Sequence, residues 1–166
     1  MILGMTIEAF TILHVVITLV AIVSGLIAVG GMFASDRLPG TTALFLFTTV
    51  LTSVTGFLFP IHGFTPAIGF GILSCVLLAI ALFAFYVKHA MGAWRWIYVV
   101  TAVISLYLNF FVLVFQSFLK VPAINALAPT QSERPFAITQ GVVLATFIII
   151  LLIAVANFRP APRTPD

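Results

Sequence analysis

Charged side chains are scarce in this chain of 166 residues. Only 7% of its residues are Asp, Glu, Lys or Arg, whereas a soluble domain carries about 25%. A buried core cannot explain so large a deficit, because a soluble surface needs charge. The seven Lys and Arg residues are scattered over the predicted loops and form no basic patch, so we expect no nucleic-acid binding.

Cysteine and the common catalytic motifs are also rare or absent. The single cysteine, Cys75, excludes an intramolecular disulfide and is expected to fill space as a small apolar residue. The sequence contains no GxSxG, HxxxH, ExxH or CxxC motif. No lysine lies within an apolar stretch, which excludes retinal-type Schiff-base chemistry, and three histidines are too few for two stacked bis-histidine haems. Whether the chain is an enzyme stays open.

Long apolar stretches fill almost the whole chain. Five of them, at residues 7–29, 42–59, 67–87, 96–118 and 137–157, contain one formal charge, Glu8. About 20 helical residues at a rise of 1.5 Å cross the roughly 30 Å hydrocarbon core of a bilayer. Barrel strands are about half as long and alternate in polarity, so helices are favoured.

The fold class is therefore predicted to be all-α. We expect an integral membrane bundle of five transmembrane helices over residues 1–158, followed by a proline-rich, disordered tail over residues 159–166. No Lys or Arg precedes Ile7, so the first stretch is expected to be a retained span and not a cleaved signal.

The basic residues predict the orientation of the bundle. Five spans place the two chain ends on opposite sides of the membrane. One side then holds Arg37, Lys88, Arg95, Arg159 and Arg163, and the other holds Lys120 and Arg134. Because basic loops stay in the cytoplasm, this split predicts an N-terminus outside and a C-terminus inside.

Polar side chains inside the apolar stretches recur at helical spacing. Polar groups avoid lipid and turn inward, and residues three or four apart share a helix face. The stripes comprise Thr11, His14 and Thr18 in the first helix, Thr48, Thr52 and Thr55 in the second, and Thr101, Ser105, Asn109, Gln116 and Lys120 in the fourth. Most of these residues fall in the half of the membrane nearer the outer face.

These stripes predict a polar pocket that opens to the outer face. The expected ligand-binding residues are His14, Thr52, Thr55, Asn109, Gln116 and Gln140, with Gln131 and Glu133 in a lid loop before the fifth helix. An alternative interpretation is purely structural. Threonine hydroxyls often bond to their own helix carbonyls, and Asn109, Gln116 and His14 can join neighbouring helices by hydrogen bonds.

Three kinds of cofactor or ligand suit such a pocket. Haem could use His14 and His62, which are the two histidines on the predicted outer side. A transition metal could use Glu8, His14 and His62, with Glu133, since imidazole and carboxylate bind zinc, copper and iron. A quinone-like molecule could lie among aromatic residues and take a hydrogen bond from His14 or Gln116. The aromatic candidates are Phe57, Phe59, Phe64 and Tyr107.

Part of the chain resembles small bacterial inner-membrane proteins that have no assigned role. The likeness is carried by Asn109, Gln116, Lys120, Pro122, residues 128–136, Gln140, the run Thr55-Gly56-Phe57 and Pro60. It covers the last four predicted helices. The resemblance implies a bacterial inner membrane as the location, and it carries over no catalytic residue.

Three functions follow from the sequence as alternatives. The first is binding of a small ligand or redox centre in the outward-facing pocket. The second is a role as an accessory or assembly subunit of a larger membrane complex, without chemistry of its own. The third is an oligomeric channel or transporter whose path is lined by the fourth helix. A bundle this small is also expected to form an oligomer or to bind partner proteins within the bilayer.

Overall fold

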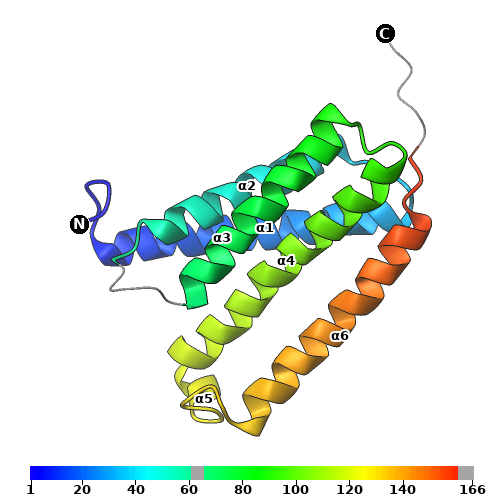
Figure 1. Ribbon diagram of the computed structural model, residues 1–166. Coiled ribbons are helices and arrows are strands. Elements are labelled where there is room, and N and C mark those ends of the chain that lie inside the picture. The colour runs from blue at the N-terminus through cyan, green and yellow to red at the C-terminus, as the bar shows by residue number, and fades with distance from the viewer. Residues whose placement is uncertain (61–65, 161–166) are drawn as a thin grey trace.

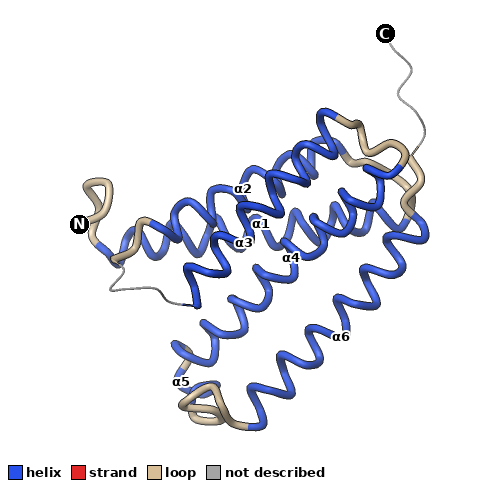
Figure 2. Tube along the Cα trace, viewed as in Figure 1, coloured by secondary structure: helices blue, strands red, loops and turns tan. Residues whose placement is uncertain are grey.

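The computed structural model describes residues 1–60 and 66–160 and is helical almost throughout (Figures 1 and 2). Its helices are α1 (Ile7–Phe33), α2 (Pro39–Phe57), α3 (Pro66–Leu82), the π-helical turn η1 (Phe83–Val87), α4 (Ala93–Lys120), the short α5 (Pro122–Asn125) and α6 (Arg134–Asn157). Figure 2 shows the loops gathered at the two ends of the helices. The described residues form no strand.

Five helices are long and apolar enough to cross a membrane, which confirms the predicted all-α fold with five spans. The second and third spans both qualify, at 19 and 20 residues. These five apolar helices indicate a multi-pass membrane protein. Residues 61–65, which include His62 and Phe64, and residues 161–166 of the predicted tail lie outside the described residues.

The first helix runs further than the sequence predicts. The predicted apolar stretch ends at residue 29, yet α1 continues through Gly30 and Gly31 to Phe33. A Cβ atom at Gly31 would lie 2.6 Å from Leu38 Cδ1. Gly31 therefore lets the loop into α2 approach the helix backbone, and its small size serves packing instead of helix termination.

The helices form a bundle around α4. The central α4 contacts α1, α2, α3 and α6, whereas α6 contacts only α4 and α1 among the described long helices. The largest buried side chains, among them Met32, Phe45, Tyr98, Leu106 and Phe158, fill the core. This core lies toward the end where α1 finishes and α4 begins.

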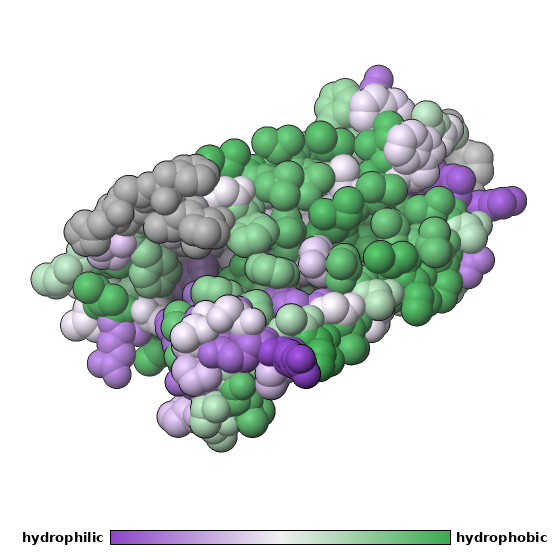
Figure 3. All heavy atoms as spheres, turned by 60° about the horizontal axis from the view of Figure 1, so that its bottom comes forward, coloured by the Kyte–Doolittle hydropathy of each residue, from purple (hydrophilic) through white to green (hydrophobic). Residues whose placement is uncertain are grey.

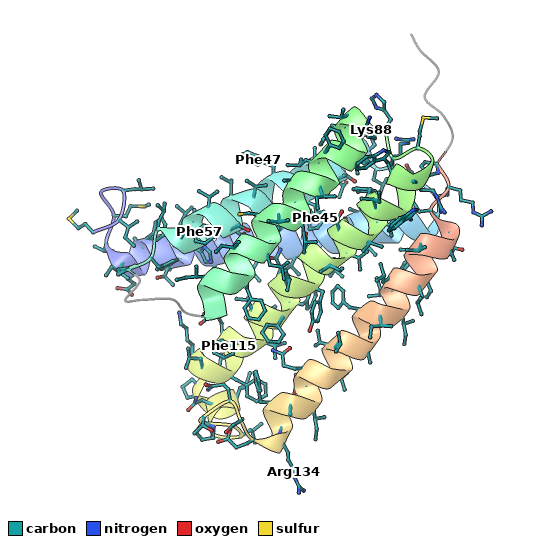
Figure 4. The ribbon with its side chains drawn as sticks, in the orientation of Figure 1. Phe45, Phe47, Phe57, Lys88, Phe115 and Arg134 are labelled. Atoms are coloured by element: carbon teal, nitrogen blue, oxygen red, sulfur yellow. The ribbon has the colours of Figure 1, made fainter. Side chains whose placement is uncertain are left out.

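Apolar side chains cover the outside of the bundle. Figure 3 shows green, hydrophobic residues over its middle and purple, hydrophilic ones toward the ends. Phe47 is 62% exposed and points away from the bundle in Figure 4, in which Lys88 and Arg134 mark opposite ends. An apolar belt between two polar ends is the surface that a bilayer requires.

The bundle is less closely packed at the end that holds the N-terminus. Figure 1 shows the C-terminal part of α4, together with α5 and the start of α6, diverging from the α1–α2 pair toward this end. Asn125 of α5 donates a hydrogen bond from Nδ2 to the Phe118 carbonyl at 2.8 Å. This contact fixes the chain where it leaves α4, and the divergence positions the site described next.

Candidate functional site

A cavity of about 430 Å³ lies between α1, α2, α3 and α4 near the N-terminal end of α1. Its main polar side chains are His14, Thr18, Thr52, Asn109, Gln116 and Lys120. Its apolar walls include Phe57, Phe59, Ile68, Phe70, Leu108 and Val112. Pockets that bind small molecules typically measure about 300–1,000 Å³ and combine apolar walls with a few polar groups. The cavity has both properties.

His14 is held at the cavity wall by two neighbours. Its Nδ1 lies 2.7 Å from Thr55 Oγ1, and its ring packs edge-on against Phe59 with ring centroids 5.3 Å apart. The packing of α1 against α2 brings His14 of α1 next to Thr55 of α2 and to Phe59, which follows α2. The imidazole is half-buried, and its position is fixed by contacts on two sides.

The threonines near His14 use their protons within their own helices. Thr55 Oγ1 donates to the Leu51 carbonyl at 2.6 Å, and Thr18 Oγ1 donates to the His14 carbonyl at 2.8 Å. Thr18 Oγ1 also lies 3.4 Å from Thr52 Oγ1. These hydroxyls thus make the expected bonds to carbonyls of their own helices. Their oxygens nevertheless remain able to accept hydrogen bonds.

The stripe on α4 divides between the core and the cavity. Thr101 and Ser105 are buried in the core and bond to carbonyls of their own helix at 2.8 Å. Asn109 reaches Thr49 Oγ1 of α2 at 3.5 Å through Nδ2. Gln116 lines the cavity, and its Oε1 is buried without a hydrogen-bond partner among the described residues. Within the described part of the chain, Gln116 Oε1 is therefore an unsatisfied buried acceptor at the cavity wall.

The fourth side of the cavity is formed by α3. A Cβ atom at Gly71 would lie 2.7 Å from Phe57 Cζ, so the Phe57 ring rests directly on the α3 backbone. Figure 4 shows Phe57 on α2. Phe70 and Ser74 also line this side. The sequence prediction omitted Phe70, Gly71 and Ser74 from the site, although Gly71 and Ser74 are three residues apart and therefore share a face.

Four predicted site residues lie outside the cavity lining, namely Thr55, which contacts His14, and Gln140, Gln131 and Glu133. Gln140 is buried and donates from Nε2 to the Phe111 carbonyl at 3.0 Å, which joins α6 to α4, and its Oε1 has no partner among the described residues. Gln131 donates to the Pro129 carbonyl at 3.2 Å. Glu133 accepts from the Thr130 hydroxyl at 2.9 Å. The predicted lid loop thus bonds to itself.

The Glu133 carboxyl is a titratable group that lies outside the membrane-spanning helices. Desolvation acts to raise the pKa of its carboxyl, but hydrogen bonds outweigh this effect. The donors are the Thr130 hydroxyl and the backbone amides of Thr130 and Ser132. The net result is a pKa below the ordinary value for glutamate, because these donors favour the charged form.

The predicted metal and haem ligands do not come together within the described residues. Glu8 is exposed in the first turn of α1. No three His, Cys, Asp or Glu side chains of residues 1–60 and 66–160 are close enough to hold a metal ion. His62 lies outside these residues, so the metal and haem sites stay predictions. Of the aromatic candidates, Phe57 and Phe59 line the cavity, whereas Tyr107 packs on Phe111 and Phe147.

Four spans thus build a mixed polar and apolar cavity, and His14, Thr52, Asn109 and Gln116 of the predicted set line it. Thr55 supports His14 from behind. The resemblance to small bacterial inner-membrane proteins stays a prediction. No protein-family model, curated protein or solved structure matches this chain.

Proposed function

We propose that this chain binds a small amphipathic molecule in the cavity between α1, α2, α3 and α4. The observation that supports this most is the buried Oε1 of Gln116, which lines the cavity without a hydrogen-bond partner among the described residues. An unpaired buried acceptor costs about 1–3 kcal/mol. A bound molecule that supplies the missing hydrogen bond would remove this cost.

The two kinds of wall suggest how such a molecule lies. The aromatic side chains Phe57, Phe59 and Phe70 offer an apolar surface of the kind that holds a ring or a short hydrocarbon chain. His14, Asn109 and Gln116 offer polar groups from α1 and α4. A ligand with an apolar body and one compact polar head satisfies both.

Binding is favoured over conduction by the packing next to the cavity. A Cβ atom at Gly25 would lie 2.6 Å from Leu106 Cδ1 and 2.8 Å from the Phe45 ring. These contacts pack α1, α2 and α4 closely together at that level. A cavity that ends against close-packed side chains suits a binding site better than a channel, which needs a continuous polar path.

The test is recovery of a bound molecule from purified protein. Ser74 lines the cavity from α3 and is buried, so Ser74→Leu fills space that the ligand needs. Thr146→Leu is the matched control, because Thr146 is exposed on α6 and bonds only to the Val142 carbonyl. Each protein is extracted with organic solvent, and the extract is analysed by mass spectrometry.

We expect the same amphipathic compound from the wild type and from Thr146→Leu. Its recovery from Ser74→Leu should fall about tenfold, which corresponds to about 1.4 kcal/mol of binding free energy. Equal recovery from all three proteins would show that the compound is bulk lipid or detergent and would contradict the proposal.

A further inference from the structure

We infer that the polar head of the ligand is a neutral hydrogen-bond donor, namely the hydroxyl group of a phenol, a quinol or an alcohol. This inference rests on the proposed function and specifies the chemical class of ligand. It excludes quinones, ethers and carboxylates, which offer only acceptors. The polar groups that the cavity leaves unpaired support it.

The tautomer of His14 follows from its contact with Thr55. A hydroxyl group has one proton, and Thr55 Oγ1 gives that proton to the Leu51 carbonyl at 2.6 Å. With the proton directed to that carbonyl, the Thr55 oxygen accepts in the 2.7 Å contact with His14 Nδ1. The proton of the neutral imidazole then sits on Nδ1, and Nε2 carries a lone pair.

This lone pair has no partner among the described residues. The hydrogen bonds of the His14 side chain involve only Nδ1, and the ring lines the cavity. The neighbouring Phe59 ring has nothing to donate to Nε2. His14 therefore presents an unpaired acceptor at the cavity, and a ligand hydroxyl can donate to it.

A second acceptor comes from the opposite side of the cavity. Gln116 of α4 has a buried Oε1 without a partner among the described residues, while His14 belongs to α1. A head that only accepts hydrogen bonds would leave both groups unpaired, which is unfavourable in an apolar cavity. A hydroxyl donates to one of them and accepts from the donors nearby, such as Asn109 Nδ2 or Lys120 Nζ.

Lys120 argues against a cationic head. An ammonium group also donates hydrogen bonds, but Lys120 lines the same cavity and no Asp or Glu does so among the described residues. Two positive charges in a cavity of low dielectric repel each other strongly. The donor must therefore be neutral, and the hydroxyl group is the simplest that also accepts.

The experiment compares two probes that differ by a single donor. 4-Decylphenol and its methyl ether, 4-decylanisole, share the same ring and chain, but only the phenol can donate. Their binding to the full-length protein in detergent is measured by calorimetry. We expect the phenol to bind about tenfold more tightly than the ether, since a lost hydrogen bond to a buried group has this effect.

Two variants locate this preference. His14→Phe keeps an aromatic ring against Phe59 and removes Nε2, so the preference for the phenol should shrink to about twofold or less. Gln116→Leu removes the second acceptor and should also reduce the preference, which preserves the test if His14→Phe fails to fold. Thr146→Val, on the exposed face of α6, should keep the full preference.

The outcomes separate this inference from the proposed function. Equal binding of phenol and ether to the wild type, with weaker binding of both to Ser74→Leu, overturns the donor-headed ligand and leaves the cavity as a binding site. Failure of both probes to bind overturns the proposed function and this inference with it. A preference that His14→Phe and Gln116→Leu both retain places the donor contact elsewhere and overturns the inference.

Discussion

Thr55 holds His14 in place with an oxygen that can only accept. Its own proton is already used by the Leu51 carbonyl, so the contact depends on the Nδ1 proton of His14. A hydroxyl that satisfies its own helix can therefore still orient a side chain of the neighbouring helix.

Replacing Thr55 by valine should free the His14 ring. Valine has nearly the same shape but no oxygen, so the Nδ1 proton loses its partner. We expect the free energy of unfolding to fall by about 1–2 kcal/mol, measured by reversible unfolding in mixed detergents. Nitrogen NMR spectra of protein with labelled histidine should show the Nδ1–H tautomer in the wild type and a mixture of tautomers in Thr55→Val.

Thr146→Val is the control for this substitution. Thr146 lies exposed on α6 and bonds only to the Val142 carbonyl, so its loss should change the unfolding free energy by less than about 0.5 kcal/mol. If both variants lose the same stability and His14 keeps its tautomer, the contact with Thr55 does not orient the ring.

Helical spacing identifies some cavity residues and not others, for a physical reason. Spacing shows which residues share a face, and polar residues turn away from lipid, so His14, Thr52, Asn109 and Gln116 could be predicted. It does not show which helix that face meets. Gln140 was predicted to line the pocket, but α6 lies beside α4 and α1, so Gln140 bonds to the Phe111 carbonyl instead.

At the scale of helices, α1 is fitted to its neighbours by one glycine. Gly25 leaves room for Leu106 of α4 and Phe45 of α2, whose side-chain atoms lie 2.6 and 2.8 Å from where its Cβ would be. Gly30, further along the same helix, has nothing within 4 Å of that position. Substitutions at Gly25 and Gly30 therefore distinguish the effect of packing from the effect of helix propensity.

Gly25→Ala and Gly30→Ala should therefore have different effects on the free energy of unfolding. Gly25→Ala forces Leu106 and Phe45 apart and should lower the unfolding free energy by about 1–3 kcal/mol. Gly30→Ala should be neutral or should raise it by up to about 1 kcal/mol, because alanine favours the helix. Both values come from the same unfolding measurement. Similar changes in the two variants would mean that α1 is not closely packed at Gly25.

The loop between α5 and α6 should respond to acid. The lowered pKa of Glu133 means that its charged form is favoured in the folded loop. Its contribution to stability is present above the unfolded-state value of about 4.5 and is lost as the pH falls through the lower folded-state value. Glu133→Gln should thus be less stable than the wild type at about pH 7, by a margin that closes under acid conditions.

Thermal unfolding as a function of pH measures this margin. A margin between wild type and Glu133→Gln that stays constant from neutral to acid pH would show that the loop contacts do not depend on the carboxylate charge. The sequence predicted a lid loop here, but it could not show that Thr130 and Ser132 would bind Glu133. Such contacts within a loop depend on backbone turns that no periodic pattern encodes.

At the scale of the whole molecule, the two ends of the bundle differ in charge. Among the described residues, Arg37, Lys88, Arg95 and Arg159 lie at the end opposite the cavity, with Asp36 as the one acid. The cavity end carries Lys120 and Arg134 together with Glu8 and Glu133. The five spans were predictable from length and hydropathy, because bilayer thickness sets the length of a span. An odd number of spans then places the two chain ends on opposite sides.

This asymmetry predicts which way the cavity faces. Excess Lys and Arg in short loops stay in the cytoplasm, so the N-terminus and the cavity should face outward. We test this with single cysteines in a Cys75→Ala background, in intact cells treated with a membrane-impermeant maleimide. Thr130→Cys, in the exposed loop at the cavity end, should be labelled. Met91→Cys, exposed beside α4 at the other end, should react only after permeabilisation.

The labelling pattern also decides where a ligand comes from. If Thr130→Cys reacts in intact cells and Met91→Cys does not, the cavity takes its ligand from the outer face or the outer leaflet. The reverse pattern would contradict the predicted orientation. The contacts of His14 and Gln116 would be unchanged, because contacts within the bundle do not depend on which way it faces. Ligand binding and orientation are therefore tested by separate measurements. If the cavity faces the cytoplasm, its hydroxyl-bearing ligand should come from the inner leaflet.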